Sequence, residues 1–134
     1  MSTEAIARVL AGKAVSNANA ARLMKDVPAD QIGDEVFGYN VQQAVEKWLK
    51  AMLAWKRRKY PFTHDIGELL DAIEKAGLTR PAEVDADLAE LLTDYAEKER
   101  HESVRTGPLL DRDALLALLD AVAAWVEDVG VKKI

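Results

Sequence analysis

Apolar side chains recur every three or four residues along most of this chain, and no stretch alternates with a period of two. The longer spacing places side chains on one face of an α-helix, whereas a period of two is typical of a β-strand. The pattern therefore predicts five helical segments. Their apolar faces are Ile6, Val9, Leu10, Leu23, Met24 and Val27; Val41, Ala44, Val45, Trp48, Leu49 and Met52; Ile66, Leu69, Leu70 and Ile73; Leu88, Leu91, Leu92 and Tyr95; and Leu115, Leu118, Leu119, Val122, Trp125 and Val126.

Proline, glycine and capping residues set the expected ends of these segments. Pro28 stops the first segment, which forms either one helix or two, because proline lacks an amide donor. The second segment begins near Asp34. Asp65 is placed to cap the third helix and Gly77 to end it, and Asp111 is placed to cap the last.

Short connections between helical segments predict an all-α fold, an antiparallel up-and-down bundle of four to five helices in one domain of residues 1–134. The wide apolar face of the second segment marks it as the central helix. Gly38 within it is expected to allow a close approach of a neighbouring backbone. If successive helices alternate in direction, the second and fourth end at the same end of the bundle. The connection 56–64 would then face residues 100–105.

Composition narrows the function classes. The chain of 134 residues has a formal net charge of -5, which argues against coating nucleic acid by bulk electrostatics but leaves room for a local basic site. It has no cysteine, no apolar run long enough to span a bilayer and no secretory leader, so we expect a cytoplasmic protein without a membrane contact. Two separated histidines and no glycine-rich phosphate loop predict no metal site and no cofactor.

The most informative stretch runs from residue 40 to residue 73. Its distinctive residues are Gln42, Gln43, Ala44, Glu46, Lys47 and Lys50, then His64, Asp65 and Leu69. In these residues it resembles the signature of HEPN domains, the higher eukaryote and prokaryote nucleotide-binding helical domains. A weaker similarity lies at Tyr95 and Arg100. The resemblance implies a helical bundle that commonly pairs as a homodimer.

Catalytic HEPN ribonucleases carry an arginine, four to six other residues and then a histidine late in the domain. Here Arg100 is followed at once by His101, and no histidine comes later. The spacing is met only by Arg57 or Arg58 with His64, in an earlier connection. The chain thus departs from the family's ribonuclease pattern.

Four consecutive cations, Lys56 to Lys59, are the first candidate site. They could hold phosphate, with Trp55, Tyr60 and Phe62 nearby to stack bases. Equally, cations at the end of a helix complement the negative end of its dipole. Both interpretations are open.

Histidines give the other candidates. His64 could act as a general base or contact a phosphate, or it could have a structural role against the second helix. Arg100, His101 and Arg105 would join His64 around one anion if the two loops share an end of the bundle; pairing of Arg100 with Glu97 or Glu99 is the simpler alternative. The predicted phosphate-binding residues are Arg57, Arg58, Lys59, His64, Arg100 and His101.

These observations favour a non-catalytic helical module that binds a nucleotide, RNA or a protein partner. By resemblance, the partner protein is a minimal nucleotidyltransferase in a toxin-antitoxin-like pair. One alternative is a metal-independent ribonuclease in which Arg58 stabilises the phosphate and His64 deprotonates the ribose hydroxyl. The other is a structural dimerisation module.

Overall fold

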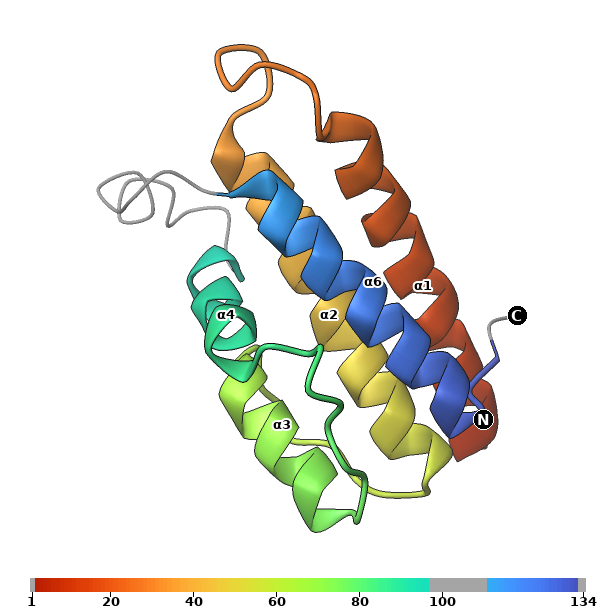
Figure 1. Cartoon of the computed structure of the whole chain (residues 1–134). Helices are drawn as coiled ribbons and strands as arrows, with labels where there is room; N and C mark the ends of the chain where they lie inside the picture. Colours follow the sequence, from red (N-terminus) through yellow and green to blue (C-terminus); the bar gives the residue numbers. More distant parts are fainter. Residues whose placement is uncertain (1, 97–110, 133–134) are drawn as a thin grey trace.

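The computed structural model describes residues 2–96 and 111–132, and it is all-α: the described parts contain no strand. Its elements in chain order are α1 (Thr3–Met24), α2 (Asp34–Trp55), α3 (Ile66–Lys75), α4 (Ala86–Leu91), the 3-10 helix η1 (Leu92–Tyr95) and α6 (Arg112–Val129). Figure 1 shows α1 and α2 running side by side in opposite directions, with α6 lying lengthwise along them and α3 and α4 on the other side of α2. The predicted helical bundle is confirmed.

Helix α2 is the centre of the core, as its wide apolar face predicts. Thirteen of its residues are buried, and two of them, Gln42 and Glu46, are polar. Its large apolar side chains, such as Phe37 and Leu49, are fully buried between the surrounding helices. Burial of one such side chain contributes roughly 1.5–3 kcal/mol relative to leaving it in water, so α2 dominates the stability of the fold.

Helix α1 is one continuous helix and packs on α2 through alanines. The buried positions are Ala7, Ala11, Ala14, Ala18 and Ala21, spaced alternately by four and three residues. This spacing gives one narrow face, and the small side chains let the two helices approach closely. The expectation that Leu23 lies on the buried face is wrong, since its side chain is 83% exposed. In the fourth segment, Leu91 is likewise exposed.

Local capping sets the helix ends as predicted. The Asp65 side chain accepts a hydrogen bond from the Glu68 amide at the start of α3, and Asp111 accepts one from the Ala114 amide at the start of α6. Such caps satisfy amides that have no partner within the helix. Gly77 follows α3 with φ of +86°, a left-handed backbone conformation that glycine adopts without strain.

The predicted meeting of the ends of α2 and the fourth segment is wrong. A Cβ atom on Gly38, near the start of α2, would lie 2.5 Å from the Tyr95 ring, so η1 ends beside the beginning of α2. Gly38 thus makes room for an aromatic ring and not for a neighbouring backbone. The reason is that residues 56–65 turn back along α2 before α3 begins, which changes the directions of α3 and α4 relative to α2 (Figure 1).

Arg112, at the start of α6, joins α6 to the turn between α1 and α2 by several hydrogen bonds. Its guanidinium donates to the carbonyl oxygens of Met24, Val27 and Ile32 at 2.7, 2.8 and 2.8 Å, and to the Asp34 carboxylate at 3.0 Å. It also lies over the Phe37 ring, 5.1 Å from the centroid. The Met24 carbonyl also accepts from the Val27 amide at 3.0 Å, so Arg112 adds a second donor there and supplies the donor for Val27 and Ile32.

Across residues 2–96 and 111–132, no helix has both the length and the apolar character that crossing a membrane requires.

Candidate functional site

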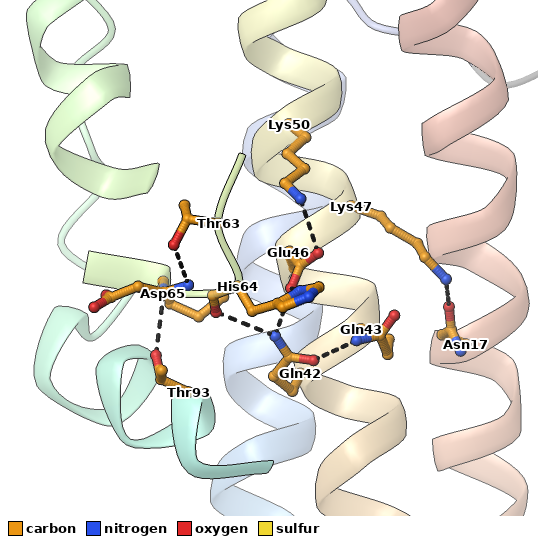
Figure 2. Close-up of polar contacts among 11 residues, drawn as sticks. Asn17, Gln42, Gln43, Glu46, Lys47, Lys50, Thr63, His64, Asp65 and Thr93 are labelled. Atoms are coloured by element: carbon orange, nitrogen blue, oxygen red, sulfur yellow. Dashed lines mark hydrogen bonds and ion pairs between the residues drawn. The ribbon is translucent and has the colours of Figure 1, made fainter. Parts of the chain in front are cut away.

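The candidate site lies along α2 and the connection after it. This connection begins at Lys56, the C-cap of α2, and then runs back beside the helix: the Lys50 ammonium lies 5.6 Å from the Tyr60 ring centroid, and His64 reaches Glu46. Figure 2 shows His64 over α2, with Lys47 and Gln43 extending from α2 towards α1. Side chains from α1, α2 and the connection thus meet on one face.

Arg57, two residues after the end of α2, has an unusual backbone conformation. Its φ is 58°, and among the described residues other than glycine it alone has a positive φ. Its amide donates to the Ala54 carbonyl and the Arg58 amide to the Leu53 carbonyl, both at 2.9 Å, which is the hydrogen-bond pattern of a Schellman cap. Glycine fills this position at lower free energy, because a left-handed backbone costs other residues about 1 kcal/mol.

The predicted basic run is present as a charged surface. Lys56, Arg57, Arg58 and Lys59 are all exposed, and none forms an ion pair with another described residue. Their position after α2 also complements the negative end of the helix dipole. The dipole explains one charge near the helix end, but it does not require four.

Glu46 is a buried carboxylate with a full set of hydrogen bonds. Its Oε1 accepts from Gln42 Nε2 at 2.8 Å and faces His64 Nδ1 at 2.9 Å, while its Oε2 accepts from the Lys50 ammonium at 3.0 Å (Figure 2). Burial opposes ionisation of Glu46, yet the hydrogen bonds from Gln42, Lys50 and His64 outweigh it and lower its pKa below the usual 4.5. Glu46 and Lys50, four residues apart on α2, therefore form an ion pair within a larger network.

The Glu46 carboxylate fixes the orientation of the His64 ring. An ionised carboxylate only accepts hydrogen bonds, so His64 Nδ1 carries a proton and Nε2 is left for another partner. The His64 side chain is 59% exposed although Glu46 is only 5% exposed. The buried carboxylate therefore orients an imidazole ring that lies at the surface. This geometry suits contact with an anion or transfer of a proton.

The structure separates some residues that the sequence grouped. The Arg58 amide donates to the Leu53 carbonyl, and Leu53 is seven residues from Glu46, about 10 Å along α2. The backbone of Arg58 therefore lies away from the Glu46 carboxylate that His64 contacts. Lys50 is the cation closest to the His64 network. Arg100, His101 and Arg105 lie outside the described residues.

Two features of the site could not be predicted from the sequence. Asn17 of α1 accepts from the Lys47 ammonium at 2.7 Å, and Thr93 of η1 accepts from the Ile66 amide at 3.1 Å, which holds the start of α3 beside the network. Both contacts join residues far apart in the sequence, and periodicity carries no signal for them. No cluster of metal-ligating side chains occurs in the part of the chain that the structure describes.

Comparison with known protein families shows that the HEPN domain model matches residues 34–129, from the start of α2 to the end of α6. No curated protein and no solved structure matches the chain. The matched range includes Gln42, Glu46 and His64, which form the polar network around the buried Glu46 carboxylate.

Proposed function

Since this chain belongs to the HEPN domain family, we propose that it is a non-catalytic HEPN module that binds the phosphates of a nucleotide or an RNA through the connection after α2. The observation that carries the proposal is the exposed run Lys56 to Lys59, which has no ion pair with a described residue and lies in the same connection as the oriented His64 ring. Unpaired cations favour a polyanion because binding releases its condensed counterions.

The backbone at Arg57 supports the same proposal. A cation is kept at a left-handed position where glycine is more stable, and strained residues cluster at functional sites. Tyr60 and Phe62 follow the run, and the Phe62 side chain is fully exposed. Aromatic rings beside cations suit single-stranded nucleic acid, because bases stack on the rings while the cations contact the phosphate backbone.

The binding test uses Arg57→Gly, for which stability and binding should move in opposite directions. We expect the free energy of unfolding to rise by up to about 1 kcal/mol, because the left-handed strain is relieved. Affinity for a fluorescent single-stranded RNA should fall about tenfold at low salt. The slope of log affinity against log salt concentration should become smaller in magnitude by about 0.7. Anisotropy titration and urea unfolding measure the two effects.

Two matched variants make this test specific. Arg57→Lys keeps the charge and should bind as wild type does. Arg22→Gln removes a cation from the far end of α1, where Arg22 pairs with Asp120 at 2.8 Å, and should leave binding unchanged. RNA affinity that is equal in wild type and Arg57→Gly would contradict the proposed role of the basic run.

Ribonuclease activity is the second candidate function, and one observation favours it. Glu46 holds His64 Nδ1 as a carboxylate holds a catalytic histidine, with Nε2 free to accept a proton. The separation of the Arg58 backbone from Glu46 speaks against it within one chain, because the phosphate would lack its predicted stabilising arginine. We therefore propose binding without cleavage.

A partner protein is also part of the proposal. The family resemblance implies a homodimer or a minimal nucleotidyltransferase beside this module. Exposed apolar side chains offer contact points, namely Leu23, Val36, Phe62 and Leu91. They are scattered over different elements, and single exposed apolar residues are common on protein surfaces. RNA binding therefore has the stronger support.

A further inference from the structure

Lys47 is a half-buried cation outside the basic run. It lies in the middle of α2 and reaches towards α1, where its ammonium donates to Asn17 Oδ1 at 2.7 Å (Figure 2). Asn17 in turn donates to Asn40 Oδ1 at 3.2 Å. An ammonium has three donors, and only one of them is bonded to a described residue.

No described carboxylate neutralises this cation. Glu46 is next to it in sequence, but both Glu46 oxygens are already bonded to Gln42, His64 and Lys50. Lys13 is an exposed residue one turn before Asn17 on α1, and it is close enough for its charge to act on Lys47. The surroundings of Lys47 therefore carry an excess of positive charge.

The titration of Lys47 reflects the same surroundings. Burial is the main cause that lowers its pKa, and the charges of Lys13 and Lys50 lower it further, while Glu46 partly offsets them. A half-buried ammonium with like charges beside it is stabilised when an anion binds. Phosphate is such an anion.

We propose that Lys47 and Lys13 form a second phosphate subsite, and that the ligand is a single-stranded RNA that spans it and the basic run. This inference rests on the proposed function and specifies its ligand. Lys47 and Lys56 are nine residues apart on α2, about 14 Å along the axis, which is longer than the phosphate chain of a mononucleotide. Phe62 follows the basic run in the same connection, and its exposed ring offers a base-stacking surface there.

The test measures how a substitution at the second subsite changes the affinity for a short RNA and for a longer RNA. Anisotropy titrations use a dinucleotide and an octanucleotide, each with wild type, Lys47→Gln, Lys47→Arg and Lys25→Gln. For Lys47→Gln we expect octanucleotide affinity to fall about fivefold to tenfold and its salt slope to shrink by about 0.7, with dinucleotide affinity unchanged. Lys47→Arg keeps the charge and should restore binding. Lys25 pairs with Asp113 just beyond the C-terminal end of α1 and serves as the charge-matched control.

The outcomes separate this inference from the proposed function. If Arg57→Gly weakens octanucleotide binding but Lys47→Gln behaves as Lys25→Gln does, the second subsite is refuted and the proposed function stands. If wild type binds neither RNA, the proposed function itself fails. If a mononucleotide competes as well as the octanucleotide does, the ligand is not an extended strand. Thermal melting confirms that each variant is folded.

Discussion

Replacing Arg112 with alanine is expected to lower the free energy of unfolding by about 3–5 kcal/mol. The guanidinium is 12% exposed and bonds to Met24, Val27, Ile32 and Asp34 at once. Its removal leaves the carbonyl oxygens of Val27 and Ile32 without this donor, leaves Met24 with only the Val27 amide, and uncovers the Phe37 ring. Urea unfolding monitored by circular dichroism measures the change.

Arg22→Ala is the control for this prediction. Arg22 also pairs with an aspartate at 2.8 Å, but both side chains are exposed, so the loss should be less than about 1 kcal/mol. Equal losses in the two variants would show that Arg112 does not hold the turn between α1 and α2.

The second large effect is expected from Glu46→Gln, which should lower the free energy of unfolding by about 2 kcal/mol at neutral pH. All three partners of Glu46 donate hydrogen bonds to its carboxylate. A glutamine side chain has an NH₂ group in place of one oxygen, and this NH₂ group would face another donor. The loss should depend on pH. Because the pKa of Glu46 is lowered in the folded state, its contribution is complete above pH 4.5 and disappears as pH falls through the folded pKa.

The difference in stability between wild type and Glu46→Gln should therefore narrow below pH 4.5. Urea unfolding at a series of pH values tests this, with Glu68→Gln as the control because Glu68 is exposed on α3. A difference that stays constant down to the acid limit would mean that the Glu46 charge is not what stabilises the network. In Glu46→Gln, His64 should also lose its preference for the tautomer with a proton on Nδ1, which its nitrogen chemical shifts report.

The helices and their caps were predictable because the signals are local. Asp65 and Asp111 bond to amides three residues away, and apolar periodicity reflects a face of the same helix. Part of the predicted buried face of α1 is wrong. Leu23 is more hydrophobic than alanine but is exposed, whereas alanines such as Ala14 and Ala18 are buried. Close helix packing selects small side chains, which hydrophobicity alone does not mark.

The site was predictable only where charge is concentrated in sequence. The run Lys56 to Lys59 and the nearby His64 stand out by composition. The contact between His64 and Glu46 depends on the return of the connection along α2, and the contact between Lys47 and Asn17 depends on the register of α1 against α2. Neither the course of a connection nor the register of two packed helices is encoded in a local pattern.

The most direct test of the proposed function is photocrosslinking of the wild-type protein to a single-stranded octanucleotide RNA that carries 4-thiouridine at successive positions, without added metal. We predict crosslinks in the peptide of residues 56–64, especially at Tyr60 and Phe62, and RNA that stays intact. Crosslinks confined to α3 and α4 would contradict the proposed site. RNA that is cleaved by wild type but not by His64→Ala would contradict the non-catalytic function.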